Sequence, residues 1–468
     1  MVPGHRRRAP VQSLAVPHRS PLAVGAVAVA TTLLTSGPLY RVRTWWGFDV
    51  PLADDPWIVA AGAVIAVAGV LVAARDRQRL PRSLCVTVIA VGALLVVSTA
   101  WSTDRVTTLR ETLLIAGTLA AGLAGAALLD IARLAWATWG GLHVGLAWSF
   151  VAIYADRPGT LDRRGDWAGI FFNRNLLALY AALGVGLSLA LALDAFARRR
   201  ARSSAGSNHS LTVLAILVAG LAMLADLRLL AGTDAATPVG ALLVALIACV
   251  LAVLARRAVR AGVSADRVSA IGGGVFVAAV ALAYVTRTSW LERLGRRGDL
   301  TDRTDLWSVV WDWSMRQPLS GFGYLGAWNE RPLIREVRRA TGKRLTSAHN
   351  SLLEVLLGGG VLGFLAFVAF IVVVFWLTAR IAVRRAGVIG LVPFGVVVFV
   401  LVENLTETLF RGSQLVVALL AGAGAAAWAA DRAVPAGHAG LASGAGPRRG
   451  DDERVEQGEG ERVRPVVE

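Results

Sequence analysis

The chain has 468 residues, of which 55% are hydrophobic and only 17% are charged, and its mean hydropathy is +0.59. Soluble domains carry about 25% charged residues, so this composition excludes an ordinary soluble enzyme. The formal net charge is +16. Nucleic-acid binding would need a basic patch on a soluble face. Here the arginines stand in short runs between apolar blocks, so no nucleic-acid partner is expected.

Apolar blocks of membrane-spanning length recur along the whole chain. Because a bilayer core of about 30 Å needs about 20 apolar residues in a helix, the blocks predict an all-α, polytopic membrane protein with about twelve transmembrane helices. The expected spans are 21–38, 57–74, 83–100, 111–129, 134–154, 168–196, 210–231, 237–255, 268–285, 351–378, 387–404 and 413–430. The first block could be a signal peptide, but its apolar run continues into Leu39 and Tyr40, which favours a retained span.

Arginine-rich connections predict the orientation of these spans. Every second short connection is rich in arginine, with Arg75, Arg77, Arg79, Arg82, Arg198, Arg199, Arg200, Arg202, Arg256, Arg257, Arg260, Arg380, Arg384 and Arg385. Connections of this kind stay in the cytoplasm. Both termini are therefore expected inside, which agrees with an even number of spans. Cys85 and Cys249 lie within apolar blocks and predict neither a disulfide framework nor a zinc site.

The predicted organisation has five parts. They are a cytoplasmic N-terminal tail (1–20), nine transmembrane helices (21–285), a large extracytoplasmic catalytic loop (286–350), three further helices (351–431) and a disordered cytoplasmic tail (432–468). The loop is strongly basic, and long loops translocate largely regardless of charge. A loop of this length in a compact protein is usually functional, so the catalytic groups are expected there.

Within the loop, Asp302 to Arg316 predicts an amphipathic helix that Asp302 caps and Gln317-Pro318 ends. Arg303 and Trp307 share one of its faces. Because tryptophan favours the headgroup level of a bilayer, the helix is expected along the outer membrane surface, with Arg303 at the height of a lipid phosphate. A solvated helix carrying one more arginine is the alternative.

His349 directly precedes the tenth span, within Ser347-Ala348-His349-Asn350-Ser351. The positive end of a helix disfavours an imidazolium, so a neutral His349 is a candidate general base for a hydroxyl group. The alternative is a polar interface residue beside a helix cap. No second histidine or carboxylate stands at metal-ligand spacing, so zinc is not predicted.

Arg174, between Asn173 and Asn175, marks the outer end of the sixth span. A guanidinium at the start of an apolar helix is costly unless it faces a cavity or an anion, and there it could bind a phosphate through two hydrogen bonds. A snorkelling arginine is the alternative. Further polar residues at membrane edges are Asp226 and Arg228, which could pair with each other, and Glu403, Asn404 and Glu407.

Taken in order, these motifs resemble those of the O-antigen ligase and O-antigen polymerase family, bacterial membrane enzymes that use glycans carried on undecaprenyl diphosphate. The resemblance is carried by Gly169 to Asn175, Arg303 to Trp307, Gln317 to Gly323, His349-Asn350-Ser351 and Gly358 to Gly363. The order, the spacing, the number of spans and the position of the large loop also match. The resemblance covers roughly Gly169 to Thr408, about half of the chain.

The resemblance implies inverting glycosyl transfer on the outer membrane face without a metal or other cofactor. An undecaprenyl-diphosphate-linked glycan would be the donor, and a glycan or lipid hydroxyl, reached beside the membrane lipid, the acceptor. His349 would deprotonate that hydroxyl, and Arg303 and Arg174 would bind the diphosphate, with Asn173 and Asn175 beside them. The family often has a Ser-Arg pair where this chain reads Thr233-Asp234, and Arg228, about one turn earlier, is a candidate replacement.

Other functions remain open. A secondary transporter or polysaccharide exporter would carry charges near the membrane midplane and repeat symmetry. A metal-dependent glycosyltransferase using a lipid-monophosphate sugar would need acidic residues in the first outer loop, where Asp54-Asp55 stand. A structural scaffold is a further alternative. Ligase and polymerase share their donor chemistry and differ only in the acceptor, so both remain possible.

Overall fold

The computed structural model describes residues 20–45, 56–162, 164–171, 173–202, 209–285, 301–411 and 414–433. Within these ranges all regular secondary structure is helical, apart from an isolated β-bridge between Leu161 and Trp167, which confirms the all-α fold class. The predicted disordered tail from residue 434 onward, Asp54-Asp55 and the first part of the large loop (286–300) lie outside the described residues.

Each predicted span overlaps at least one described helix. The helices are α1 (Pro21–Leu34), α2 (Gly37–Trp45), α3 (Pro56–Arg75), α4 (Arg82–Val97), α5 (Arg105–Leu128), α6 (Ile131–Tyr154), α7 (Arg174–Arg202), α8 (His209–Gly232), α9 (Ala236–Arg260), α10 (Ala265–Val285), α12 (Thr301–Ser314), α13 (Arg331–Thr341), α14 (Ser351–Arg384), α15 (Val392–Glu403) and α16 (Leu415–Arg432). Short 3-10 turns are η2 (Arg77–Arg79), η3 (Ser98–Ala100), η4 (Gly326–Asn329) and η5 (Ile389–Leu391).

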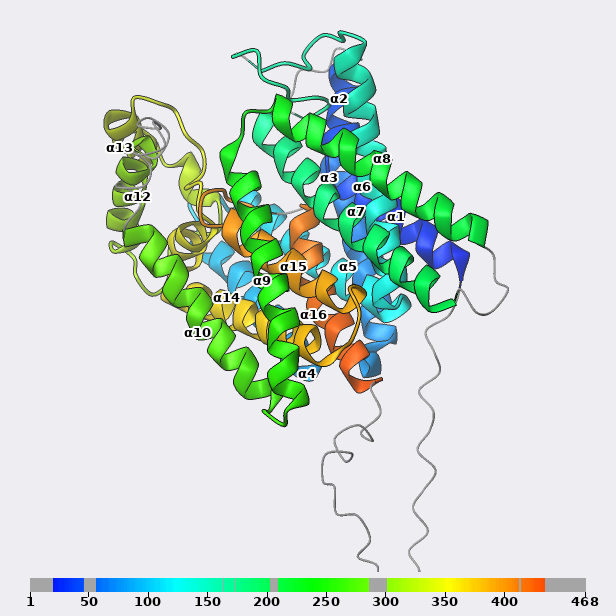
Figure 1. Ribbon diagram of the computed structural model, residues 1–468. Coiled ribbons are helices and arrows are strands. Elements are labelled where there is room, and N and C mark those ends of the chain that lie inside the picture. Colours follow the sequence, from blue (N-terminus) through cyan, green and yellow to red (C-terminus); the bar gives the residue numbers. More distant parts are fainter. Residues whose placement is uncertain are drawn as a thin grey trace, which may run out of the picture. The chain divides into compact units, whose positions relative to one another are not determined.

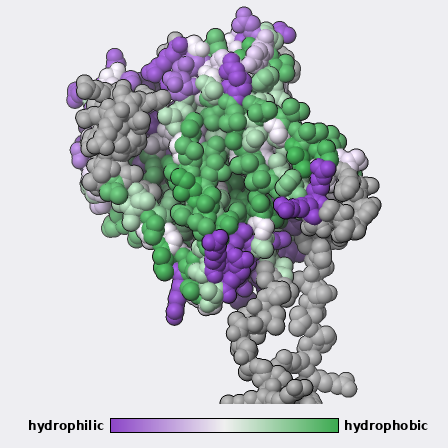
Figure 2. Space-filling view, viewed as in Figure 1, coloured by the Kyte–Doolittle hydropathy of each residue, from purple (hydrophilic) through white to green (hydrophobic). Residues whose placement is uncertain are grey.

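Seven helical segments in the described part are long and apolar enough to cross a membrane: α4 with η3, α5, α7, α8, α9, α14 and α16. Figure 2 shows a broad apolar band across the molecule between polar regions above and below. Exposed side chains such as Val64, Leu221, Ile247 and Val275 contribute to the apolar surface, and lipid is the solvent that suits them. The chain is therefore a multi-pass membrane protein; the count of twelve spans and their orientation stay predictions.

Two predicted spans differ from the helices that form. The first is divided into α1 and α2, because Ser36 takes a left-handed conformation (φ 62°) and Pro38 follows it. The sixth was expected from residue 168, but α7 begins only at Arg174. There the Asn173 side chain accepts the backbone N–H of Leu176 at 2.9 Å and caps the helix.

α14 is interrupted at Gly360, whose backbone (φ 60°, ψ −166°) is not helical. Segment 318–323, from the large loop, fills the interruption. The Val361 N–H donates to Pro318 O at 2.7 Å, and the Gly323 N–H donates to Gly358 O at 2.9 Å. A Cβ atom on Gly321 would lie 2.6 Å from the Gly358 carbonyl carbon, so only glycine permits this approach. The loop is thereby fixed to the membrane helix that follows His349.

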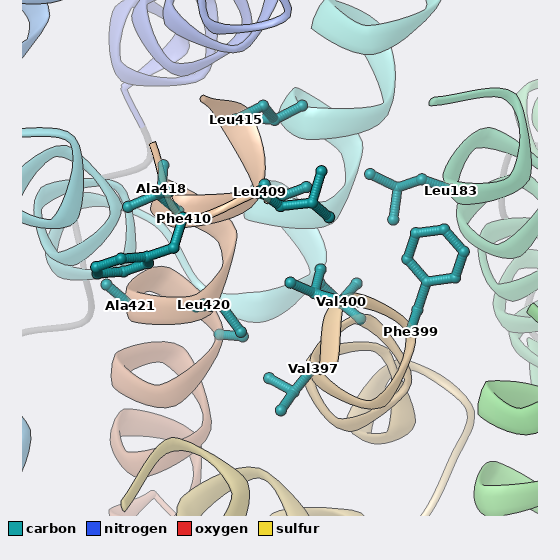
Figure 3. Packing of buried hydrophobic residues seen from close by; sticks show 14 of the residues in the cluster. Leu183, Val397, Phe399, Val400, Leu409, Phe410, Leu415, Ala418, Leu420 and Ala421 are labelled. Atoms are coloured by element: carbon teal, nitrogen blue, oxygen red, sulfur yellow. The ribbon is translucent and has the colours of Figure 1, made fainter. Parts of the chain in front are cut away.

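The turn between α15 and α16 is held by a buried apolar cluster. Figure 1 shows α14, α15 and α16 close together, and Figure 3 shows Phe410 of the turn beside Ala418 and Ala421 of α16. Leu409 and Phe410 are both buried, and the Phe410 ring lies 4.5 Å from that of Phe367. Burying two large side chains stabilises the turn by a few kcal/mol, and residues 403–408 are positioned as a consequence.

Candidate functional site

One carboxylate, that of Glu407, brings together residues from three distant parts of the chain. Its Oε2 lies 3.0 Å from Nδ1 of His349. Its Oε1 accepts a hydrogen bond from Arg303 Nη2 at 2.8 Å and another from Asn175 Nδ2 at 2.9 Å. We call Asn175, Arg303, His349 and Glu407 the Glu407 cluster. The three motif regions predicted to carry chemistry each contribute a residue to it.

His349 is held with one ring nitrogen against Glu407 and the other directed elsewhere. A carboxylate accepts hydrogen bonds, so Nδ1 carries a proton, and in the neutral imidazole Nε2 keeps a lone pair. The His349 side chain is 32% exposed, whereas that of Glu407 is 18% exposed. The His349 backbone is left-handed (φ 48°), a conformation that costs about 1–2 kcal/mol outside glycine. The imidazole is therefore both accessible and in the tautomer that a general base needs.

The backbone after His349 is fixed by Asn350, which caps α14. Its Oδ1 accepts the N–H groups of Leu352 and Leu353 at 2.9 and 3.1 Å, and its Nδ2 donates to Leu405 O at 3.1 Å. Asn350 thus serves as the helix cap and also ties the start of α14 to the turn that carries Glu407.

The backbone before His349 is fixed by the buried side chain of Glu354. Its Oε2 accepts the Ala348 N–H at 2.8 Å and the Thr408 hydroxyl at 3.3 Å, and its Oε1 accepts the Trp328 indole N–H. The Trp307 indole N–H donates to Ala348 O at 2.9 Å. Both peptide groups of Ala348 are therefore bonded to side chains, which leaves the preceding backbone little freedom.

Glu407 lies outside the membrane-spanning segments. Burial raises the pKa of its carboxyl, but the hydrogen bond from His349 and the charge of Arg303 outweigh burial and hold the pKa below its ordinary value of 4.5. Glu407 is therefore ionised at neutral pH. A fixed negative charge next to His349 stabilises the positive charge that the imidazole gains when it accepts a proton.

Arg303 lies on α12, which is anchored to other parts of the protein through its Trp307 face. Its Nη1 donates to Thr406 O at 2.6 Å. Trp307 and Val310, on the same face, are buried, and the Trp313 indole donates to Glu336 at 2.6 Å. Trp307 and Trp313 are therefore not available as anchors in the lipid headgroups, and the position of this helix along the outer membrane surface stays a prediction. Both fill the protein interior and find indole partners there. The Asp302 side chain lies outside the described residues.

Of residues 173–175, only Asn175 belongs to the Glu407 cluster. Asn173 caps α7. Arg174 forms a short ion pair with Asp166, and its Nε lies 3.7 Å from Asp162 Oδ2. Its guanidinium is therefore engaged by carboxylates of the preceding segment.

Arg228 and Asp226 do not pair with each other, contrary to the expectation. The Arg228 guanidinium carbon lies 3.9 Å from the centre of the Trp167 ring, a cation–π contact. Asp226 is 1% exposed, and its Oδ2 lies 2.9 Å from Nε2 of His143 on α6. A buried carboxylate without a hydrogen-bonding partner would be costly among apolar helices. His143 supplies that partner to Asp226. Within the described ranges, no hydrogen bond or ion pair joins Arg228 to the Glu407 cluster.

Glu407 and His143 are the residues whose roles the sequence did not reveal. The sequence marks Glu407 only as a polar residue at a membrane edge, although a carboxylate directly after an apolar span is itself a signal. Among the described residues, no group of three or more His, Cys, Asp or Glu is arranged to hold a metal ion. Cys85 and Cys249 are free thiols.

Residues 221–368 match the model of a family described as O-antigen ligase. The matched segment includes Arg303 and His349 and ends before Glu407. A comparison with curated proteins gives no match.

Proposed function

We propose that this chain, a member of the O-antigen ligase family through residues 221–368, transfers a glycan from an undecaprenyl-diphosphate-type carrier to an acceptor hydroxyl on the outer face of the cytoplasmic membrane. The family supports a membrane enzyme that joins glycans. The observation that carries the finer proposal is the Glu407 cluster, where a histidine, a carboxylate and an arginine meet at the end of apolar helices. No cofactor is part of the proposal.

In the proposed reaction, Nε2 of His349 accepts the proton of the acceptor hydroxyl as its oxygen attacks the anomeric carbon of the donor sugar. The new C–O bond forms as the bond between that carbon and the diphosphate oxygen breaks, and the electron pair leaves with the diphosphate. A single displacement of this kind inverts the anomeric carbon. Glu407 keeps Nδ1 protonated and stabilises the imidazolium.

Arg303 is proposed to stabilise the departing diphosphate. A guanidinium has five N–H donors, and the bonds to Thr406 and Glu407 use two of them. The others suit phosphate oxygens, because the planar guanidinium matches their geometry. Arg174 is a second proposed contact, for which the diphosphate would have to displace Asp166. Arg228 is a third proposed contact to the diphosphate. Its guanidinium is stacked on Trp167, and the N–H groups at its edge would donate to the phosphate oxygens.

The proposal is tested with the full-length protein in liposomes, supplied with an undecaprenyl-diphosphate-linked glycan and an acceptor glycan. We expect His349→Ala to abolish the joined product on a gel while the protein still elutes as a folded species and still binds the donor lipid, because Arg303 is unchanged. Wild-type levels of product from His349→Ala would overturn the proposed role.

Two further measurements separate this proposal from its alternatives. Transfer that continues in excess EDTA is expected here, whereas loss in EDTA and recovery with Mg²⁺ would favour the metal-dependent transferase. A transporter would move the lipid-linked glycan across the liposome membrane without forming a covalent product. Ligase and polymerase are distinguished by the acceptor that is consumed.

A further inference from the structure

Helix α13 separates apolar and basic residues onto opposite sides. Leu333, Val337 and Thr341 are buried, and α13 packs against α12 (Figure 1). The exposed side carries Arg331, Arg335, Arg338 and Arg339, which we call the α13 arginine face. Their spacing of i, i+4, i+7 and i+8 places the four guanidinium groups along one stripe of the helix, about 12 Å long at 1.5 Å per residue.

Arg338 and Arg339 lie in the last turn of α13, where they complement the helix dipole, but the fold gives Arg331 and Arg335 no such role. In the part of the chain that the structure describes, no ion pair involves any residue of the α13 arginine face. The helix has one acidic residue, Glu336, and it pairs with Arg316 at 3.1 Å. Like charges at i, i+4 destabilise a helix, and a cation at a helix N-terminus, such as Arg331, opposes the helix dipole. An anionic partner would remove both penalties.

A bilayer is a poor candidate for that partner. A helix that binds a membrane surface exposes an apolar face beside its basic one. The apolar residues Leu333 and Val337 of α13 are instead buried. The α13 arginine face therefore suits a polyanion in water.

The arginine face lies close in sequence to the candidate base. α13 ends at Thr341, and His349 follows eight residues later, a stretch that spans at most about 28 Å when extended. The intervening residues include the exposed Arg344. A polymer lying on α13 can therefore extend to His349 and present a hydroxyl there.

We propose that the α13 arginine face binds an anionic glycan, one that carries uronate or phosphate groups, and holds it as the acceptor chain for His349. This inference rests on the proposed function for the acceptor role, whereas glycan binding by α13 stands independently. Carboxylate and phosphate groups are the anions that guanidinium groups bind best. A row of exposed arginines also speeds the capture of a polyanion and makes capture salt-dependent.

The test measures binding of fluorescent polygalacturonate to the full-length protein in phosphatidylcholine nanodiscs. We expect binding that weakens as NaCl rises, and little binding of a neutral dextran of the same length. The variant Arg335→Gln/Arg338→Gln/Arg339→Gln should raise Kd about tenfold, because each exposed ion contact contributes a factor of about two to five in affinity. The matched control removes three exposed charges elsewhere, Arg257→Gln/Arg260→Gln/Arg267→Gln, and should leave Kd unchanged.

Equal binding of dextran and polygalacturonate, or an unchanged Kd in the α13 variant, would overturn the proposal. So would binding of the wild-type protein to phosphatidylglycerol vesicles without binding of the glycan. His349→Ala should bind polygalacturonate as the wild type does. The binding measurement therefore tests the α13 arginine face even if the transfer reaction fails. Where transfer occurs, the α13 variant should raise the KM for an anionic acceptor and leave kcat unchanged.

Discussion

The imidazole of His349 and the carboxylate of Glu407 meet at 3.0 Å across 58 residues of sequence. The other oxygen of the same carboxylate holds Arg303 and Asn175. A single ionised group thus orients the candidate base and the candidate anion-binding residue together. A change at Glu407 is expected to affect both of them, which distinguishes it from a change at either partner.

Glu407→Gln should lower kcat for glycan transfer by about 10- to 100-fold, the range for residues that orient a reacting group. The amide keeps nearly the same shape but cannot hold the charge that stabilises an imidazolium. Glu407→Asp keeps the charge and should recover part of the rate. The control is Glu336→Gln, which removes a carboxylate that pairs with Arg316 away from the site. A larger loss in Glu336→Gln than in Glu407→Gln would contradict the assignment.

Arg303→Ala should reduce transfer by about 100-fold or more, because it removes charge stabilisation of the leaving diphosphate. Arg303→Lys should restore only part of the rate, since a point charge cannot reproduce the planar guanidinium. The quantity to measure is kcat/KM with respect to the lipid-linked donor. Full recovery with lysine would show that charge alone suffices and would refute the bidentate role.

The depressed pKa of Glu407 predicts how stability changes with pH. Because the folded pKa lies below the ordinary value of 4.5, the unfolded chain takes up this proton at higher pH than the folded chain. The contribution of Glu407 to stability is therefore full above about pH 4.5 and is lost as the pH falls through the folded value. The melting temperatures of wild type and Glu407→Gln should differ near pH 7 and converge on acidification. A difference that stays constant would argue against an ionised Glu407.

Gly321→Ala should destabilise the protein by about 2–4 kcal/mol, through left-handed strain together with a steric clash. Its new Cβ would lie 2.6 Å from backbone atoms at Gly358 and Gly360. Gly342→Ala is the matched control, because Gly342 is also left-handed (φ 68°) but has nothing within 4 Å of an added Cβ. It should cost only the strain, about 1–2 kcal/mol. Equal losses of melting temperature would mean that the close approach of segment 318–323 to α14 contributes nothing.

The helices could be predicted because a transmembrane segment is a continuous run of about 20 apolar residues, which is visible locally in the sequence. The ends of helices were harder. Asn173 delays the start of α7 through a side-chain cap, and Ser36 divides the first apolar block through a left-handed backbone. Each effect comes from a single polar residue, and a hydropathy average over about 20 residues does not register one residue.

The site was predicted in its parts and not in its assembly. Arg303, His349 and the 173–175 segment stand out locally, by charge or by rarity. Their common partner Glu407 is 104 residues from Arg303 and 232 from Asn175, and no local pattern specifies contacts at such distances. The same holds for His143 and Asp226, which lie 83 residues apart. Arg174, in contrast, has acidic neighbours at 162 and 166 that could have suggested its ion pairs.

The position of Glu407 also decides how the chain can be divided. The segment that matches the family, 221–368, contains Arg303 and His349 but neither Asn175 nor Glu407. Moved alone into another membrane protein, it would bring the candidate base His349 and Arg303 without the carboxylate that contacts both. The candidate site is built from the ends of several helices. Transferring the proposed activity to another protein would therefore require moving α7 and the α15–α16 turn along with the loop.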